Sequence, residues 1–433
     1  MYASVPNKFL IAVIIASVWM LFSIWIAIDW YHALATHIGK FFSGFVITFI
    51  AIIPGFINTF VVISLMLDKR PTRTIPTAFP PLSILIAAYN EASNITNTLQ
   101  SIEDQCYPGE LDVIVINDGS RDATRAIVKK YAAHNPWLRL INVRKNAGKA
   151  HALDVGLEAA RHAIIVTIDA DTYLYKDALI YIVERYLSDP QRTKAIAGTI
   201  LVRNSRDNWV TRAQEWDYFH GIAAIKRVQS LYQGTLVAQG AFSLYDKQAL
   251  IEACGWPNTV GEDIVLTWAL LAAGYRVGHC EEACAFTRVP DTLKGFIGQR
   301  QRWARGMIEA FKYHSGTLFK KRLSTFFIWW DLLFPLLDIT FTFGFIPGLI
   351  LAMFGKFWIA GPMTLAVLPF ALMLNGKMFQ VGKAMFDAHG LKVRRNRIGF
   401  IIYLAAYNLI LQPVCVYGYC MELFNLKRTW GTK

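Results

Sequence analysis

Charged residues are scarce in this chain, and several long stretches have none. Only 17% of the 433 residues are Asp, Glu, Lys or Arg, whereas about a quarter is usual for a soluble domain. Charge is absent from residues 9–28, 41–67, 339–355, 357–376 and 398–421. Because about 20 apolar residues cross a bilayer, we expect two spans before the central region and about three after it. The stretch 339–355 reaches full length only with residues 332–337.

The sequence also lacks the motifs of several common binding sites. It contains no Gly-x-Gly-x-x-Gly and no Walker sequence, which excludes the usual nicotinamide and ATP sites. Its six cysteines show no metal-ligand spacing, and free thiols suit a reducing compartment. The net charge of +13 fits anionic lipid headgroups or a phosphorylated substrate. A basic chain can also bind nucleic acid, but no recognition motif for it is present, so we expect no nucleic-acid partner.

Basic residues at the ends of the apolar stretches predict the orientation of the chain. The connection 31–40 contains only Lys40. Basic residues follow the second stretch and precede the last one: Lys69, Arg70, Arg73, Lys392, Arg394, Arg395 and Arg397. Since such residues gather on the cytoplasmic side, we expect a multi-pass protein of the inner (plasma) membrane with a cytosolic central domain. A signal peptide ending near "ALA" at 33–35 is the alternative for the first stretch.

Short apolar runs alternate with helical patterns through the central region, which we place at residues 76–306. The runs at 82–88 and 111–116 are each followed by a polar turn and a helix pattern, and "LRLINV" and "IIVTI" repeat the scheme. This alternation predicts an α/β domain with a mainly parallel, doubly wound sheet. Residues 1–75 and 331–433 are the predicted membrane parts, and 307–330, rich in basic and aromatic residues, are predicted to form interfacial amphipathic helices.

Acidic residues occur where predicted strands end or a helix begins. Asp118 follows "VIVIN", where it suits either a hydrogen bond to a nucleoside or a helix cap. Asp169 and Asp171 follow "IIVTI", and two carboxylates so close repel unless a cation lies between them. Mg²⁺ or Mn²⁺ bridging a diphosphate would satisfy them. Asp263, with Glu262 beside it, precedes "IVLTWALL" and is a candidate general base. The alternative for both acidic pairs, Asp169 with Asp171 and Glu262 with Asp263, is that they begin or cap a helix, where its dipole favours negative charge.

The stretch "GQRQRWARG" at 298–306 is unusually rich in amide, guanidinium and indole groups. In a helix, Gln299, Arg302 and Trp303 share one face. Guanidinium binds a diphosphate in bidentate fashion, and the indole suits the face of a pyranose. The alternative is an interfacial helix with snorkelling arginines and a membrane-belt tryptophan. Arg305 lies outside the Gln-x-x-Arg-Trp set and is expected to behave as an interface residue.

The order of these motifs resembles the processive family 2 glycosyltransferases, which include cellulose, chitin, hyaluronan and poly-N-acetylglucosamine synthases. The series is "YNE", "NDGS", "GKA", "DAD", "ED" and "QRQRW". It covers residues 80–306 by motif and the remainder by topology. "VPDTLKGFIGQRQRWARG", with two N-terminal spans, is most similar to the bacterial poly-β-1,6-N-acetylglucosamine synthases.

The resemblance implies a GT-A fold, a UDP-sugar donor, a growing polysaccharide acceptor and Mg²⁺ or Mn²⁺. It leaves room for a small membrane subunit as a partner. By position in the motifs, the donor site would use Tyr89, Glu91, Asp118, Lys149, Asp169 and Arg302, and the metal would bind Asp169 and Asp171. The catalytic residues would be Asp263 and Glu262. The acceptor site would use Gln239, Gly240, Gln299 and Trp303.

Two departures from the family pattern bear on sugar identity and linkage. Gly261 stands where the poly-N-acetylglucosamine enzymes usually have Thr, and "AGTILVRN" at 197–204 lacks their usual Pro. Transfer of a single sugar to a lipid phosphate is the nearer alternative function, although such enzymes generally lack Gln-x-x-Arg-Trp. A sugar-nucleotide sensor without turnover is the more distant one, and it would have no need of the base Asp263.

Overall fold

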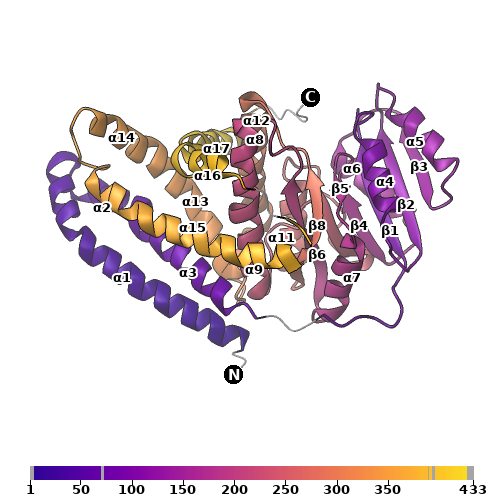
Figure 1. The fold of residues 1–433 in the computed structure, drawn as a ribbon, viewed down its shortest axis with the longest axis horizontal. Coiled ribbons are helices and arrows are strands. Elements are labelled where there is room, and N and C mark those ends of the chain that lie inside the picture. Colours follow the sequence, from indigo (N-terminus) through magenta and orange to yellow (C-terminus); the bar gives the residue numbers. More distant parts are fainter. Residues whose placement is uncertain (1–3, 70–72, 389, 393–394, 427–433) are drawn as a thin grey trace.

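The structure is a computed structural model that describes residues 4–69, 73–388, 390–392 and 395–426. It has two parts, a mixed α/β domain and a group of long apolar helices, and Figure 1 shows them side by side. Helix α12 (Leu293–His314) stands between the two parts. The predicted domain boundary at residue 306 lies inside this helix.

One eight-stranded sheet forms the centre of the α/β domain, in the order β3-β2-β1-β4-β7-β6-β8-β5. Its strands consist largely of β-branched and other apolar residues, which favour strands buried on both faces. Their bounds are β1 Leu82–Ala88, β2 Leu111–Asp118, β3 Leu138–Val143, β4 Ile164–Ile168, β5 Tyr173–Leu174, β6 Thr193–Val202, β7 Phe242–Asp246 and β8 Arg276–Thr287.

Strands β7 and β5 run opposite to the other strands of the sheet. Strands β3, β2, β1 and β4 are parallel, as the alternating pattern predicts for a doubly wound sheet. Strand β7 is antiparallel to both β4 and β6. This reversal places the start of β7 beside the end of β4, where Ile168 pairs with Phe242. The segment before β7 therefore reaches the same sheet edge as the acidic turn after β4.

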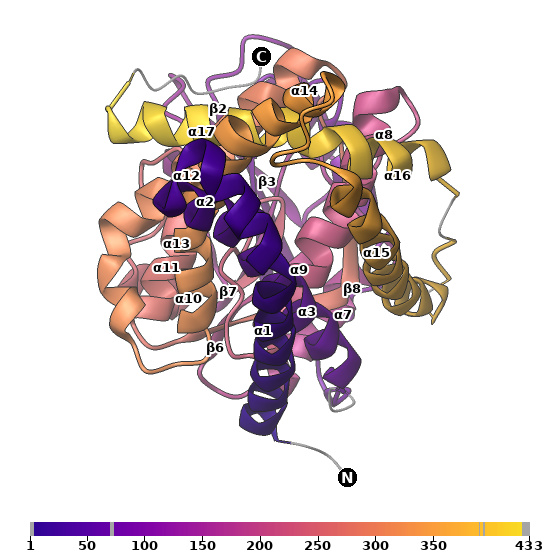
Figure 2. The same ribbon diagram turned by 90° about the vertical axis from the view of Figure 1, so that its left-hand side faces the viewer.

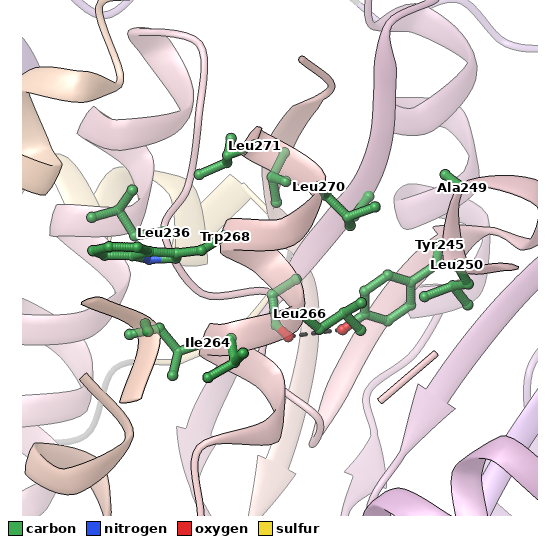
Figure 3. Packing of buried hydrophobic residues seen from close by; sticks show 14 of the residues in the cluster. Leu236, Tyr245, Ala249, Leu250, Ile264, Leu266, Trp268, Leu270 and Leu271 are labelled. Carbon is green, nitrogen blue, oxygen red and sulfur yellow. Dashed lines mark hydrogen bonds between the residues drawn. The ribbon is translucent and has the colours of Figure 1, made fainter. Parts of the chain in front are cut away.

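Helices cover both faces of the sheet and enclose two apolar clusters. On one face lie α4 (Ile95–Glu103), α5 (Thr124–Ala132) and α7 (Ala178–Ser188). On the other lie α6 (Lys149–Ala159), α10 (Lys247–Glu252) and α11 (Glu262–Ala272). Figure 3 shows this second cluster, with Trp268 and Leu266 of α11 packed among side chains of neighbouring elements. The packing fixes α11, whose first turn carries Glu262 and Asp263.

Four helical segments of the described residues are long and apolar enough to cross a membrane. They are Val5–Ile38 (α1), Lys40–Leu67, Thr325–Met353 and Arg397–Leu423. Each of the last three contains a π-helical segment between two α-helices. In the second segment, η1 (Thr48–Ile52) separates α2 (Lys40–Ile47) from α3 (Ile53–Leu67). In the third, η4 (Phe341–Phe345) separates α13 (Thr325–Thr340) from α14 (Ile346–Met353), and in the fourth, η5 (Tyr403–Tyr407) separates α16 (Arg397–Ile402) from α17 (Asn408–Leu423). In Figure 2, α16 and α17 cross the view above α1.

Two of the predicted membrane segments after the central domain can be compared with helices of the structure. The third span begins at Thr325, so it takes in the end of the segment 307–330 that the sequence predicts to be interfacial. The stretch 357–376 falls largely on α15 (Pro362–Ala388). Many side chains of this helix lie outside the described residues, so the expectation of a span there stays a prediction.

Aromatic and ionic contacts join the long helices to the α/β domain. Phe9 of α1 packs edge-on against Phe60 of α3, with ring centroids 5.6 Å apart, and against Tyr232, 5.1 Å away. Arg227 of α9 (Ile225–Leu231) forms ion pairs with Asp68 at 2.6 Å and with Glu281 of β8 at 3.0 Å. The end of the second span is therefore anchored to the domain by both apolar and charged contacts.

Candidate active site

The loops after β1 and β2 are held together by hydrogen bonds. The amide of Glu91 donates to the Thr124 hydroxyl at 2.8 Å, and the amide of Arg121 donates to the side-chain oxygen of Asn90 at 2.9 Å. Asn90 adopts a left-handed conformation, with φ +57°, which Asn tolerates better than most residues. Tyr89 is 39% exposed beside these contacts. Part of this residue is therefore accessible to a ligand, and its place in the donor site stays a prediction.

Asp118 lies at the end of β2 and is almost fully buried. Its carboxylate accepts hydrogen bonds from the amides of Ala147 and Gly148, at 3.0 and 2.8 Å. Gly148 has φ +100°, a conformation that favours glycine. Asp118 thus fixes the turn that leads into α6 and places Lys149 at the first position of that helix.

Lys149 is the centre of the predicted site. Its Nζ lies 2.6 Å from Oδ1 of Asp169 and 3.5 Å from Oε1 of Glu262. Burial alone would lower the pKa of Lys149, but the two carboxylates more than offset it and raise the pKa. A Cβ on Gly240 would lie only 2.6 Å from this Nζ. Segments from β4, α6, α11 and the loop before β7 therefore meet at one ammonium group.

Glu262 and Asp263 begin α11 and face the same place. Burial raises the pKa of Glu262 to about 7, although Lys149 acts to lower it. Asp263 accepts a hydrogen bond from the Gly240 amide through Oδ2, at 3.4 Å, and another from the Ile264 amide through Oδ1, at 2.8 Å. The structure thus brings together the acidic pair and the Gly240 segment, and the roles of these residues in catalysis and acceptor binding stay predictions.

The other acceptor candidate in this segment, Gln239, has a structural contact as well. Its side-chain amide donates to the Gly198 carbonyl of β6 at 2.6 Å. Its Oε1 is buried without a hydrogen-bond partner among the described residues. The side chain therefore links the loop before β7 to β6, and its role in binding an acceptor stays a prediction.

Asp169 and Asp171 are the two candidate ligands of a divalent cation. Asp169 contacts Lys149, and Asp171 accepts a hydrogen bond from the Thr287 hydroxyl at 3.4 Å. No group of three or more His, Cys, Asp or Glu side chains is arranged for a metal within the described ranges. The donor set nevertheless fits Mg²⁺ or Mn²⁺, because such ions bind to one or two carboxylates and complete their shell with phosphate oxygens and water.

Helix α12 presents the Gln-x-x-Arg-Trp set to this region. Burial lowers the pKa of Arg302, while Glu262 and Tyr218 act to raise it. The Arg302 guanidinium is therefore close enough to both groups to interact with them electrostatically. That guanidinium has no hydrogen bond or ion pair to the part of the chain that the structure describes. Oε1 of Gln299 is buried and equally unpaired within that part, and Trp303 is 42% exposed. All three side chains have capacity left for a ligand.

The other two arginines of the stretch are buried in ion pairs. Arg300 lies 2.8 Å from Asp217, and Arg305 lies 3.1 Å from Glu422 of α17. Both arginines are 4% exposed. The interpretation of this stretch as a helix with snorkelling arginines is therefore wrong for these residues, and Arg305 is not an interface residue.

Tyr218 and Lys226 belong to this region but carry no recognisable sequence signal. Tyr218 lies on the π-helical segment η2 (Asp217–Ala224). Burial raises its pKa to about 12, with smaller effects from Arg300, Asp217, Asp171 and Gln299. Burial lowers the pKa of Lys226 to about 7, against the charge of Asp263. Both residues lie in a segment without a strand-end motif, so only the fold brings them to the site.

Comparison with known proteins shows that part of this chain is similar to a known family. Residues 83–253 match the family model described as glycosyl transferase family 2. These residues form a family 2 glycosyltransferase domain. The domain carries the donor-side candidates from Tyr89 to Asp171, together with Gln239 and Gly240. The acidic pair on α11 and the Gln-x-x-Arg-Trp set on α12 follow after its matched residues.

Curated relatives of this family share part of the chain. The poly-β-1,6-N-acetyl-D-glucosamine synthase of Staphylococcus aureus (strain COL) is 32% identical over 241 residues, which are 55% of this chain and 57% of the relative. The enzyme of the same name from Staphylococcus epidermidis is 32% identical over 252 residues, or 58% of this chain and 60% of that protein. The chain thus spans somewhat over half the length of these relatives in the matched region.

A solved structure supports the fold over a longer part of the chain. The mannosyltransferase PcManGT from Pyrobaculum calidifontis, in complex with GDP-Man and Mn²⁺, superposes with a TM-score of 0.57 at 20% identity. The superposition covers 84% of this chain and 93% of that one. The predicted GT-A-like fold of the glycosyltransferase domain is therefore confirmed.

Proposed function

We propose that this protein is a membrane-embedded, inverting, processive glycosyltransferase that polymerises UDP-N-acetylglucosamine into a β-linked polysaccharide and translocates the product. The convergence of Asp169, Glu262 and Gly240 on Lys149, beside Asp263, carries this proposal. This convergence brings the donor-side carboxylate of Asp169 close to the candidate base Asp263. The names of the staphylococcal relatives supply the sugar and the polymer.

In the proposed reaction, Asp263 removes the proton from an acceptor hydroxyl. The resulting oxygen attacks the anomeric carbon of the donor on the face opposite the diphosphate. The bond from that carbon to the diphosphate oxygen breaks, UDP leaves with the electron pair, and the α-configured donor yields a β linkage. The Gly240 amide, 3.4 Å from Oδ2 of Asp263, holds the base in place.

Positive groups of the chain stabilise the departing diphosphate, where negative charge develops. Arg302 has a planar fork that binds phosphate oxygens in pairs, and its guanidinium has no other partner among the described residues. Lys149 supplies a second positive charge at 2.6 Å from Asp169. A divalent cation held by Asp169 and Asp171 would add Lewis-acid stabilisation of the same charge. The Mn²⁺ in the complex of the solved mannosyltransferase supports this role.

Donor screening in membrane vesicles tests the proposal directly. Vesicles containing the protein are given radiolabelled UDP-N-acetylglucosamine, UDP-glucose or GDP-mannose, and polymer is separated from lipid-linked product by solvent extraction. We expect label from UDP-N-acetylglucosamine in a high-molecular-mass polymer, and loss of that label when EDTA removes divalent cations. Label confined to the lipid fraction would instead identify a single-sugar transferase.

Two exposed cysteines of the glycosyltransferase domain allow its orientation to be tested. Cys106 and Cys254 are free and exposed, and we propose that this domain faces the cytosol at the inner membrane. A thiol reagent that cannot cross membranes should label them in inverted vesicles but not in intact spheroplasts. Equal labelling in spheroplasts would place the domain on the opposite side. A Cys106→Ser, Cys254→Ser variant controls for labelling at other thiols.

A further inference from the structure

The ring of Trp303 has a cation over one face, and the residue is partly exposed. The guanidinium of Arg300, three residues earlier on α12, lies 4.0 Å from the centroid of the Trp303 ring. A cation at this distance is attracted to the aromatic face. Trp303 is nevertheless 42% exposed, so part of this side chain is accessible to a ligand such as a sugar.

Arg300 itself is held on several sides. Its guanidinium lies 5.2 Å from the ring of Phe296 and 5.9 Å from that of Tyr218. A guanidinium nitrogen lies 2.8 Å from Oδ2 of Asp217, an ion-pair distance, although the geometry is outside that of a hydrogen bond. Arg300 is 4% exposed. Since a buried cation is costly without a partner, Asp217 and the surrounding rings fix where this guanidinium can lie.

The elements around Arg300 come from opposite ends of the site. Asp217 and Tyr218 belong to η2, and Arg300 and Trp303 belong to α12. The rings of Tyr218 and Trp303 are 6.1 Å apart. The position of the Trp303 ring therefore depends on a contact between two segments that lie more than seventy residues apart in the chain.

We propose that Arg300, held by Asp217, is a positioning residue that sets the orientation of the Trp303 ring and so the binding of the acceptor sugar. This inference rests on the proposed function, because it assumes that Trp303 meets the acceptor. It goes beyond that function by assigning a role to a guanidinium that is sealed from solvent and that touches neither the diphosphate nor the acceptor.

A double-mutant design separates this role from a general effect on folding. Asp217→Asn with Arg300→Met removes both charges together, so that no unpaired charge stays buried. This neutral pair is combined with Trp303→Ala, and the Michaelis constant (KM) for a β-1,6-linked N-acetylglucosamine pentasaccharide is measured for each protein in detergent. Arg300→Lys, which keeps the charge and the contact with the ring, is the conservative variant.

We expect the neutral pair to raise the acceptor KM roughly 10-fold, a size typical of a lost aromatic contact that orders a ligand, with the affinity for UDP unchanged. On the Trp303→Ala background the neutral pair should add less than about 2-fold, because its effect passes through the missing ring. The acceptor KM of Arg300→Lys should be closer to the wild-type value than that of the neutral pair.

A second buried ion pair on the same helix is the matched control. Arg305→Met with Glu422→Gln neutralises a pair that is as buried as the first. Glu422 also pairs with Lys312, but that side chain is partly exposed and can be solvated when the carboxylate is lost. The variant should leave the acceptor KM within about 2-fold of wild type. The inference would be overturned if the neutral pair raised the acceptor KM by the same factor in the Trp303→Ala background as in the wild-type background. It would also be overturned if the neutral pair left the acceptor KM unchanged. A wild-type protein that transfers no sugar to any acceptor would instead refute the proposed function.

Discussion

The donor side and the acceptor side of the site are built differently. On the donor side, Asp118 is bound by two backbone amides and Asp169 by Lys149, so these polar groups are already paired. On the acceptor side, Oε1 of Gln299 has no hydrogen-bond partner among the described residues, and Trp303 is partly exposed. The donor side is thus stabilised by the fold itself, whereas the acceptor side keeps its polar capacity for a ligand.

Sequence position follows the same division in part. The donor candidates other than Arg302 lie within the residues that match the family model, 83–253, as do the acceptor candidates Gln239 and Gly240. The acidic pair of α11 and the Gln-x-x-Arg-Trp set of α12 lie after the matched residues. Helix α12 is held by contacts from other parts of the chain, such as the 2.9 Å hydrogen bond from the Gly261 amide to Glu309. The acceptor side therefore depends on packing between distant segments, and the following variants test how far the two sides act separately.

The largest effect is expected where the two sides meet, at Asp263. Asp263→Asn keeps the size of the side chain and can still accept from the Gly240 amide, but it cannot take a proton. We expect kcat to fall about 10²-fold or more, with UDP affinity unchanged. Steady-state kinetics together with UDP binding would check this. If Glu262→Gln instead gives the larger loss of kcat, the base is Glu262.

Arg302→Lys is expected to have the next largest effect. The variant keeps the positive charge but loses the planar fork, so stabilisation of the leaving diphosphate should fall and kcat with it, by roughly 10²-fold. Arg288→Lys is the control, because Arg288 is an exposed arginine in a 3.7 Å surface ion pair with Asp207. Similar, mild losses for both variants would argue against a diphosphate contact at Arg302.

Glu262 predicts a pH dependence of stability. Its pKa is raised by burial from 4.5 to about 7, so the folded protein holds this proton more tightly than the unfolded chain does. The stabilisation is present below pH ~4.5 and is lost as the pH rises to ~7, for a total of roughly 3 kcal/mol. The difference in thermal stability between wild type and Glu262→Gln should change across this window and stay constant above it. A difference that is flat from pH 4.5 to 7 would contradict the prediction.

The smallest effect is expected at Gly240. A Cβ there would lie 2.6 Å from Nζ of Lys149, but the lysine is long enough to move aside. Gly240→Ala should therefore weaken the contact with Asp169 and lower kcat/KM only a few-fold, about 3- to 10-fold by analogy with mild displacement of a positioned group. Gly316→Ala, where a new Cβ meets no atom within 4 Å, should leave kcat/KM unchanged.

Local patterns were enough to predict the parallel half of the sheet and the residues at its edge. The runs at 82–88, 111–116 and 164–168 form β1, β2 and β4 because each is apolar over the length of a strand and is followed by turn residues. Parallel strands end at one edge, so Asp118 and Asp169 had to lie there. Four of the five predicted membrane spans coincide with long apolar helices of the described residues, since long uncharged stretches need no tertiary contact to be recognised, and the fifth, at 357–376, stays a prediction.

Tertiary structure decided what no local pattern contains. The antiparallel placement of β7 brings Gly240 to Lys149, although the two residues lie far apart in the sequence. Packing of η2 and α17 against α12 turns Arg300 and Arg305 into buried ion-pair partners and leaves Arg302 free of one among the described residues. The sequence by itself determined which residues could do chemistry, because residue type and strand-end position are local properties. Which arginine is sealed and which stays open depends on neighbours supplied by distant segments, and only the fold brings those together.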